Sequence, residues 1–542
     1  MQNGIAGMNT QTFHVLLLYP RFTAGSFWNY GATCELVGAK YPAPPLGLIT
    51  VAAMLPKAWN ARLVDRNTDD LTDADLEWAD MVFTGGMLPQ QADTLKMVAK
   101  CKKIGVPVVV GGPDATSSPE IYESADFRVL GEAEGIFGKF IEAWERGERS
   151  GTFSAEKFKA DVTTTPVPRF DLLNFKNYVQ VNVQFSRGCP FTCEFCDIIE
   201  LYGRRPRTKT SAQMLAELDR LYELGYRGHV DFVDDNLIGN KKAVKAFLPD
   251  LIEWQKKHNN AFEMSTEASL NLADDNALLD MMQQARFFSV FIGIESPDPD
   301  VLVAAQKKQN TRRDISKSVH RIYDAGIWVL AGFIVGFDEE SDHVAKEISA
   351  LIEEAAIPVS MTGLLFALPT TQLTRRLERE GRLHAGFDQF DEDDGFGDQC
   401  TSGLNFETKR DRIAILTDYR DIVDKIYAPE AYFRRVRKVG DMLNMRGENG
   451  TLLGAGFGHD LKMFGKLIWS MTFTNTTYRG PFWRTLIHTA LYNFRAIKPV
   501  MMMIALYVHL GPFSRYVVRQ IDTQIAEVES GEWTTPELVA AE

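Results

Sequence analysis

Short β-rich runs alternate with helical stretches along much of the sequence, in two successive series. Strands that alternate with helices favour a parallel sheet, since a parallel connection needs a crossover of about a dozen residues or more. We therefore expect residues 1–150 to form an α/β domain with a doubly wound, Rossmann-like sheet. The β-rich runs of this first series cover residues 15–19, 61–65, 81–84, 106–110 and 127–130.

The second series contains six strand-helix units and predicts an incomplete (β/α)6 barrel over residues 176–390. In a barrel of this kind functional residues gather at the carboxyl ends of the strands. A polar, proline-containing segment precedes it, and we interpret residues 151–175 as a linker. The predicted barrel strands cover residues 181–186, 229–233, 262–266, 288–294, 328–335 and 359–366.

From about Asp391 the sequence changes to helical segments, which predicts a third, mainly helical domain over residues 391–542. Its first residues include an acidic run, 391–394, to which we assign no role. Residues 451–520 contain eight Lys or Arg, one acidic residue and twelve aromatics. Such a surface suits a contact at the level of membrane headgroups. The alternative is that the aromatics are core residues and the charges a solvated face.

The formal charge of −13 disfavours a nucleic-acid partner, because the phosphate backbone attracts positive charge. The apolar run at residues 499–510 falls short of the roughly 20 residues that a spanning helix needs. No signal peptide is visible at the start, so we expect a cytoplasmic protein. The basic, aromatic segment adds the hypothesis that this protein contacts the inner face of the membrane peripherally.

Three cysteines lie within eight residues, directly after the first predicted barrel strand. Cys189, Cys193 and Cys196 have the spacing C-x3-C-x2-C, and soft thiolates of this kind suit an iron-sulfur cluster. Three thiolates would hold three irons of a [4Fe-4S] cluster and leave the fourth open for the amino and carboxylate groups of S-adenosylmethionine. The alternative is a zinc site with a fourth ligand from Asp197 or Cys400.

The stretch Ser-Arg-Gly-Cys-Pro-Phe-Thr-Cys-Glu-Phe-Cys-Asp resembles the radical S-adenosylmethionine (SAM) superfamily. That resemblance implies that residues at later strand ends bind SAM. Each could instead cap a helix or permit a turn. The residues concerned are Asp234 and Asp235 after the second strand, Glu267 after the third, Glu295 and Ser296 after the fourth, and Gly332, Ile334 and Gly336 at the fifth.

Five short motifs in the first domain resemble the cobalamin domain that is fused to radical enzymes. They lie at residues 44–48, 64–67, 85–87, 111–113 and 131–134. The alternative is a structural or nucleotide-binding sheet. The resemblance implies these cobalamin-binding residues: Asp65, Asn67, Gly85, Gly86, Gly111, Gly112 and Glu132.

The first domain lacks the motif Asp-x-His-x-x-Gly, whose histidine binds cobalt in the methionine-synthase type of cobalamin domain. No histidine lies between His14 and His229. We therefore expect no histidine ligand from this domain, with the lower face of cobalt left to water, to another side chain or to nothing. A weaker axial ligand would change how readily cobalt gives up a methyl group.

Most of the chain resembles cobalamin-dependent radical methylases with a helical extension, among them hopanoid C-2 methylases. The phrases at residues 27–30, 40–48 and 233–240 carry this resemblance. It implies that one SAM methylates cobalamin while a second, split at the cluster, yields a radical that removes hydrogen from an unactivated sp³ carbon. The implied substrate is a hopanoid or similar polycyclic lipid, and the implied electron donor is of flavodoxin or ferredoxin type.

Three other functions fit parts of the sequence. An enzyme with both cofactors could form a carbon-carbon bond or a ring, in a lipid or tetrapyrrole, without net methyl transfer. An RNA methylthiotransferase would need a further cysteine triplet upstream, where Cys34 and Cys101 are too far apart. A cobalamin-sensing protein without enzymatic activity would leave the cysteine triplet without a use.

Overall fold

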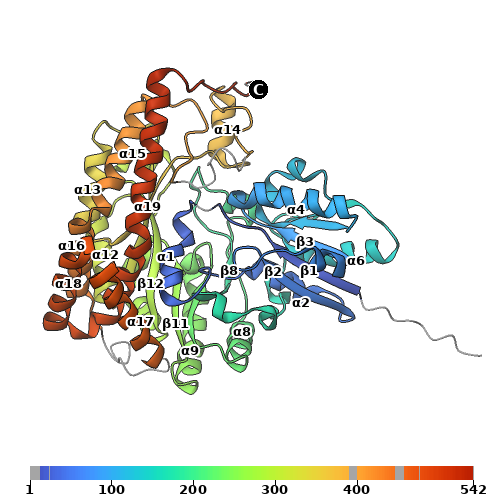
Figure 1. The fold of residues 1–542 in the computed structure, drawn as a ribbon, viewed down its shortest axis with the longest axis horizontal. Helices are drawn as coiled ribbons and strands as arrows, with labels where there is room; N and C mark the ends of the chain where they lie inside the picture. The colour runs from blue at the N-terminus through green and yellow to red at the C-terminus, as the bar shows by residue number, and fades with distance from the viewer. Residues whose placement is uncertain (1–12, 24, 390–399, 446–456, 475, 541–542) are drawn as a thin grey trace, which may run out of the picture.

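The computed structural model describes residues 13–23, 25–389, 400–445, 457–474 and 476–540. Two six-stranded sheets and a helical region make up the described chain (Figure 1). The two sheets and the helical region confirm the predicted fold class. Residue 390 and the acidic run at 391–394 lie outside the described residues, so the boundary predicted there stays a prediction.

The N-terminal sheet is entirely parallel and has the strand order β2-β1-β3-β4-β5-β6. Its last strand was not predicted, because Gly151–Ser154 is a short edge strand whose side chains are at most half-buried, which leaves no apolar run to detect. The start of the predicted linker is therefore part of this sheet. The strands are β1 (Phe13–Tyr19), β2 (Trp59–Asp65), β3 (Met81–Gly85), β4 (Val108–Gly111), β5 (Phe127–Leu130) and β6 (Gly151–Ser154).

Helices cover both faces of this sheet because alternate residues of each strand point to opposite sides. Leu16 and Leu18 of β1 pack toward one set of helices, and Val15 and Leu17 pack toward the other. The first set is α3 (Asp73–Trp78), α4 (Gln91–Ile104) and α5 (Gly112–Ser117), and the second is α2 (Leu46–Met54) and α6 (Phe137–Glu145).

The second sheet has its strands in chain order and all parallel, as a partial barrel requires. The six strands predicted from the sequence all form. They are β7 (Gln180–Val183), β10 (Gly228–Phe232), β11 (Phe262–Glu267), β12 (Phe287–Glu295), β13 (Trp328–Val335) and β14 (Val359–Leu364). The helices of this part of the chain are α8 (Ser211–Glu223), α9 (Lys241–Lys257), α10 (Asn276–Gln284), α11 (Pro299–Ala304), α12 (Ile315–Asp324), α13 (Val344–Glu354) and α14 (Gln372–Arg379).

The helical region covers the exposed edge of β14. An edge strand presents unpaired backbone groups that need partners. The Tyr427 hydroxyl accepts from the Ser360 N–H at 3.2 Å and donates to the Ser360 carbonyl at 2.8 Å. This region consists of α15 (Arg412–Tyr427), α16 (Pro429–Met442), α17 (Phe457–Trp469), the π-helix Ser470–Thr474, α18 (Arg479–Tyr492) and α19 (Ile497–Ser530).

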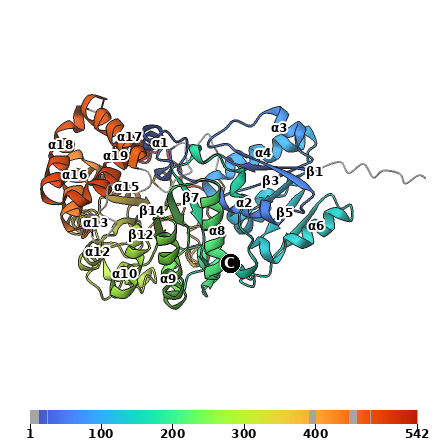
Figure 2. The ribbon, with the colours of Figure 1, turned by 90° about the horizontal axis from the view of Figure 1, so that it is seen from below.

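An N-terminal segment packs beside the barrel, between the two sheets and the helical region (Figure 2). Its short helix α1 (Gly31–Val37) lies against α19, and the Thr33 hydroxyl donates to the Ala505 carbonyl at 2.9 Å. Just before α1, the Trp28 ring meets Phe291 of β12 edge-on, with 5.4 Å between centroids. Segments from both ends of the chain therefore complete the wall around the barrel.

One helical stretch of the described chain, Phe494–Ser530, is long and apolar enough to cross a membrane by length and composition. Of its most apolar 18-residue window, 61% is buried against the rest of the protein. Packing against α15 and α16 thus accounts for much of this apolar character.

Arg435 joins α16 to the barrel and provides a test of this packing. The side chain is fully buried, pairs with Glu353 of α13 and donates from Nε to the Ile357 carbonyl at 2.7 Å. Arg435→Met should lower the free energy of unfolding by about 3 kcal/mol, because a buried network loses its cation. Arg434→Met is the matched control, since Arg434 contacts the same carboxylate from an exposed position; it should cost less than about 1 kcal/mol. Equal shifts in urea midpoint would contradict this account.

Candidate active site

A cavity of about 560 Å³ lies where the carboxyl ends of the N-terminal strands face the barrel. This is the edge at which open α/β sheets bind ligands. Its walls contain residues from β3, β4 and α2 on one side, and Asn182, Gln184 and Lys209 on the other. Gly85, Gly86, Gly111, Gly112 and Glu132, all predicted to bind cobalamin, lie in its walls.

The glycines allow two strand ends to approach closely. A Cβ atom on Gly85 would lie 2.0 Å from the Gly111 carbonyl oxygen, and one on Gly111 would lie 2.9 Å from the Val129 oxygen. Gly47, at the start of α2, is not closely packed in this way, because a Cβ atom there would meet nothing within 4 Å. The first two glycines are thus required by the sheet itself, whereas Gly47 leaves open space beside the cavity.

Asp65 and Asn67 are not in the cavity wall. The Asp65 carboxylate accepts from the Asn67 backbone N–H at 2.9 Å and from the Tyr178 hydroxyl at 2.9 Å. The Asn67 amide accepts from the Phe22 N–H and donates to the Pro20 carbonyl. The structure gives these two residues bonds within the protein, and their contact with cobalamin stays a prediction.

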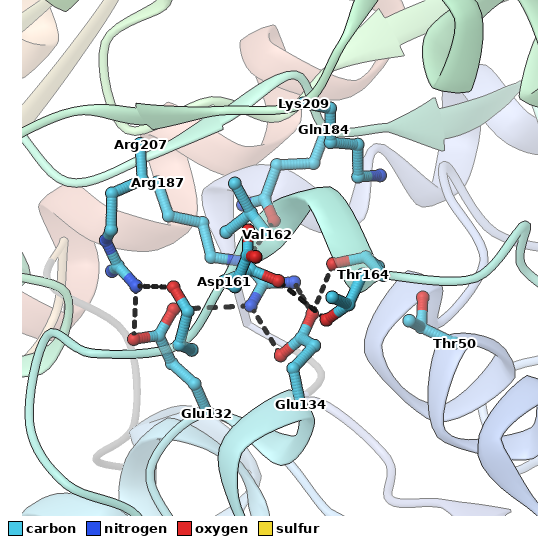
Figure 3. Close-up of polar contacts among 12 residues, drawn as sticks. Thr50, Glu132, Glu134, Asp161, Val162, Thr164, Gln184, Arg187, Arg207 and Lys209 are labelled. Atoms are coloured by element: carbon cyan, nitrogen blue, oxygen red, sulfur yellow. Dashed lines mark hydrogen bonds and ion pairs between the residues drawn. The ribbon is translucent and has the colours of Figure 1, made fainter.

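Glu132 and its neighbour Glu134 form ion pairs with two arginines from the barrel side (Figure 3). Arg187 contacts Glu134 at 2.8 Å and Glu132 at 3.3 Å, and Arg207 contacts Glu132 at 2.8 Å. The arginines face each other on the ribbon of β8 (Ser186–Arg187) and β9 (Arg207–Thr208). Although burial alone would raise it, the Arg187 guanidinium lowers the pKa of Glu134 to about 2. Four buried charges therefore join the two domains.

The β8–β9 ribbon brackets the cysteine loop, and two carboxylates hold its start. Asp234 accepts from the Phe185 N–H at 2.9 Å and from the Ser186 N–H at 2.5 Å. Asp235 accepts from the Gly188 N–H at 2.7 Å. Burial raises the pKa of Asp234 to about 6 and that of Asp235 to about 7. The predicted SAM contacts are thus engaged in positioning the loop.

The residues around the cysteine triplet fit an iron-sulfur cluster. Asn236 Nδ2 points at Cys189 Sγ from 3.8 Å, and Gln309 Nε2 points at Cys193 Sγ from 3.7 Å. Donors of this kind stabilise the negative charge of metal-bound thiolates. Burial raises the pKa of Cys189 and of Cys196, so each thiol needs a cation to release its proton.

The zinc alternative would need a fourth ligand that converges with the three thiolates on one ion. Within the described residues, no three His, Cys, Asp or Glu side chains are arranged to hold one metal ion. The ligands of a [4Fe-4S] cluster bind different irons, so they need not converge on one point. Cys400 is buried against β14, where its thiol lies 3.4 Å from the Thr362 carbonyl.

Glu295 and Gly332 lie on the side of the triplet that Lys307 occupies. Lys307 Nζ is 2.6 Å from Glu295 Oε1. Burial lowers the pKa of Lys307, but the nearby Glu295 and Cys193 raise it by more, so the net shift of the pKa is upward. Glu295 has φ +70°, a strained conformation for a residue with a side chain. A Cβ atom on Gly332 would lie 3.8 Å from Glu295 Oε2. These residues form one continuous wall.

The other predicted SAM residues have local roles. The Ser296 hydroxyl accepts from the Asp298 N–H at 3.1 Å, and Ile334 packs at the margin of the main core. Gly336 has φ +111°, and a Cβ atom there would lie 2.6 Å from Leu404. The turn and the packing of the helical region thus account for Gly336, and the contact of these three residues with SAM stays a prediction.

Glu267 ends β11 and lies in the cavity wall. Its side chain is exposed to the cavity but surrounded by protein, and burial, followed by the charge of Asp231, raises its pKa to about 8. At neutral pH this carboxyl is therefore mostly protonated and able to donate a hydrogen bond to a bound molecule.

His14 is not in the cavity wall. Its backbone N–H donates to Asp80 at 2.8 Å, and its ring stacks on Trp78 with 4.6 Å between centroids. The residues that line the cavity include no histidine. The lower ligand of cobalt stays a prediction.

Several residues of the site were missed by sequence reasoning. Arg187 stands two positions before the first cysteine, so its place in the motif was a usable signal. Asn236 directly follows Asp234 and Asp235, so its strand-end position was likewise a signal. The others had no local signal: Arg207 and Lys209 at β9, and Lys307 and Gln309 after α11.

Three protein families match successive parts of the chain. The B12 binding domain matches residues 36–141, the Radical SAM superfamily matches residues 183–352, and a domain of unknown function, DUF4070, matches residues 371–523. These matches correspond to the N-terminal sheet, the barrel and the helical region.

Several relatives are named as methyltransferases. An uncharacterized methyltransferase of Synechocystis sp. is 47% identical over 78% of this chain and 77% of its own length. The hopanoid C-2 methylase of Rhodopseudomonas palustris is 36% identical over 78% of each chain. The bacteriochlorophyllide d C-12(1)-methyltransferase of Chlorobaculum tepidum is 24% identical over 66% of this chain and 79% of its own.

Two solved structures share the fold at low sequence identity. The cobalamin-dependent SAM radical enzyme OxsB, with aqua-cobalamin bound, aligns with a TM-score of 0.58 at 14% identity, covering 97% of this chain and 82% of its own. The radical SAM methyltransferase TsrM from Kitasatospora setae aligns with a TM-score of 0.55 at 15% identity, covering 68% and 78%. The arrangement of sheet and barrel is therefore shared.

Replacing Cys189, Cys193 or Cys196 with alanine should abolish cluster assembly. Anaerobic reconstitution of the unmodified protein should give about four irons per chain, and each variant should lose most of them, because every thiolate holds its own iron. Cys101→Ala is the matched control, since this buried thiol lies in α4, outside the cysteine loop. A variant that retained the full iron content would contradict the assignment.

Filling the open space beside Gly47 should displace cobalamin. Gly47→Leu places a side chain where the cavity is open, so the retained cobalamin should fall roughly tenfold, the equivalent of about 1.4 kcal/mol. Gly138→Leu is the control, because Gly138 is likewise the second residue of its helix and free of neighbours but does not line the cavity. The readout is cobalt per chain after desalting, and equal retention in both variants would count against the site.

Proposed function

The chain belongs to the family of B12-binding radical SAM methyltransferases, and from that membership we propose that it methylates carbon 2 of a hopanoid or a similar polycyclic lipid. The identity of 36% with the hopanoid C-2 methylase, over 78% of both chains, carries this proposal. Relatives that act on tetrapyrroles are more distant, at 24% identity or less.

The residues described above support the cofactors that this family implies. When bound, the cluster would supply the electron that splits SAM, and cobalamin would carry the methyl group. Cys189, Cys193 and Cys196 would hold the cluster, with Asn236 and Gln309 directed at the sulfurs. The cavity between the sheets would hold cobalamin.

The protein's own groups would orient the reactants and control their charge. Asp234 and Asp235 fix the backbone at the start of the cysteine loop. Lys307 places a positive charge beside Cys193 and Cys196, where it would offset part of the negative charge of a thiolate-bound cluster. Glu267, protonated at neutral pH, can donate a hydrogen bond within the cavity without adding negative charge.

Expression in a bacterium that makes unmethylated hopanoids tests the substrate. We expect lipid extracts to gain hopanoids heavier by one methylene unit, with the mass-spectral fragment that contains the first ring carrying the addition. The protein with Cys193→Ala, expressed at the same level, should give the lipid profile of the host alone, because it cannot assemble the cluster.

Two outcomes separate the alternatives. Unchanged hopanoids in cells whose purified protein contains iron and cobalamin would eliminate the hopanoid substrate while leaving the family assignment intact. A product that gains a ring or a carbon-carbon bond, with no methyl group from labelled methionine, would replace methylation by the ring-forming alternative.

A further inference from the structure

We infer that the hairpin of α17 and α18 docks the protein on the surface of a membrane that contains anionic lipids. The hairpin, defined here as residues 457–496 without residue 475, lies at the end of the molecule away from the N-terminal sheet (Figures 1 and 2). This inference concerns where the enzyme sits and does not depend on the substrate proposed above.

Exposed large apolar side chains are concentrated on this hairpin. Of the fifteen in the described residues, seven fall between Leu461 and Phe494. Exposed apolar side chains that gather in one region are typical of an interaction site. The rings of Trp469 and Phe473 are in contact, tilted by 43° with 4.5 Å between centroids. The seven are Leu461, Trp469, Phe473, Ile487, Leu491, Tyr492 and Phe494.

Positive charge accompanies the apolar residues. Between Phe457 and Arg495 the sequence has five Lys or Arg residues and one acidic residue, in a chain whose formal charge is −13. On α17, Leu461 and Trp469 are two turns apart on one stripe, with Lys462 and Lys466 beside it, all exposed. On α18, Ile487 lies one turn after Arg484, and Leu491 lies two turns after it. Apolar stripes flanked by cations are suited to anionic headgroups.

A second copy of the chain fits this surface poorly. In a two-fold dimer the same patch would face itself, and its lysines and arginines would repel one another. An anionic bilayer offers both the negative charge and the apolar interior that the patch lacks. The strongly negative remainder of the protein would be repelled, which would orient the hairpin toward the lipid.

A groove of about 480 Å³ lies beside this surface. It runs between α17 and α1 and is lined by Glu35, Leu36, Gly465, Lys466, Trp469 and Ser470. The segment directly before α1 carries Trp28, which contacts Phe291 of β12. Phe291 alternates with the core residues Val290 and Ile292, so it points to the inner side of the barrel.

Vesicle flotation with the cofactor-loaded, full-length protein tests the inference. The unmodified protein should bind vesicles of phosphatidylcholine with phosphatidylglycerol, and bind phosphatidylcholine alone more weakly. Leu491→Glu and Trp469→Glu should each weaken binding about tenfold or more, because a charge would have to enter the interface. Lys462→Glu with Arg479→Glu should weaken binding to the anionic vesicles by roughly fivefold for each charge removed.

Matched variants elsewhere on the surface serve as controls. Val303→Glu changes a side chain of α11 that is 62% exposed, comparable with Trp469 at 63%, and should leave vesicle binding unchanged. Lys317→Glu on α12 is the charge control. Iron content and melting temperature, measured for every variant, show which variants are folded. The apolar substitutions and the basic substitutions test the contribution of each kind of side chain to vesicle binding separately.

Two results would overturn the inference. One is that the unmodified protein fails to float with anionic vesicles, or that Val303→Glu weakens binding as much as Leu491→Glu does. The other is that sedimentation shows a dimer which Leu491→Glu converts to a monomer, while no form of the protein binds lipid. That result would assign the hairpin to a second copy of the chain.

Discussion

The junction between the two sheets depends on one buried group of four charges. Arg187 and Arg207 occupy opposite positions on a short antiparallel ribbon, where two like charges would repel each other. Glu132 and Glu134 of the N-terminal domain neutralise them. The same ribbon brackets the cysteine loop, and the carboxylates that offset the charge of the arginine pair come from the other domain. The loop that would hold the cluster is therefore fixed by the domain that would hold cobalamin.

Parallel topology explains why the site lies at this junction. All strands in one parallel sheet have their carboxyl ends at the same edge, and here two such edges face each other across the cavity. Loops after β3, β4 and β5 form one wall, and residues at and after the ends of β7, β10 and β11 contribute to the other. A molecule in the cavity would contact both domains, as a transfer between two cofactors requires.

Periodicity and motif spacing were sufficient for the two sheets and the cysteine triplet, because both signals are local in sequence. The same reasoning assigned Asp65, Asn67 and Asp234 to cofactors, and that assignment stays a prediction. The sequence did not reveal that the structure also bonds these side chains to Tyr178, to Phe22 and to the backbone of Phe185 and Ser186. A carboxylate at a strand end is visible in the sequence, but its partner is not. The edge strand β6 was not predicted for a related reason: its side chains are half-exposed and do not form an apolar run that the sequence would reveal.

The helical region is part of the barrel's construction rather than an appended module. A six-stranded parallel sheet that does not close has two free edges, and unpaired backbone groups there would otherwise need water. Tyr427 bonds both backbone groups of Ser360 on β14, and α19 holds α1 in place through Thr33. Removal of the region would uncover an edge strand and detach the segment that carries Trp28. The helices therefore complete the radical SAM barrel. The outward face of α17 and α18 remains exposed and is available for contact with other molecules.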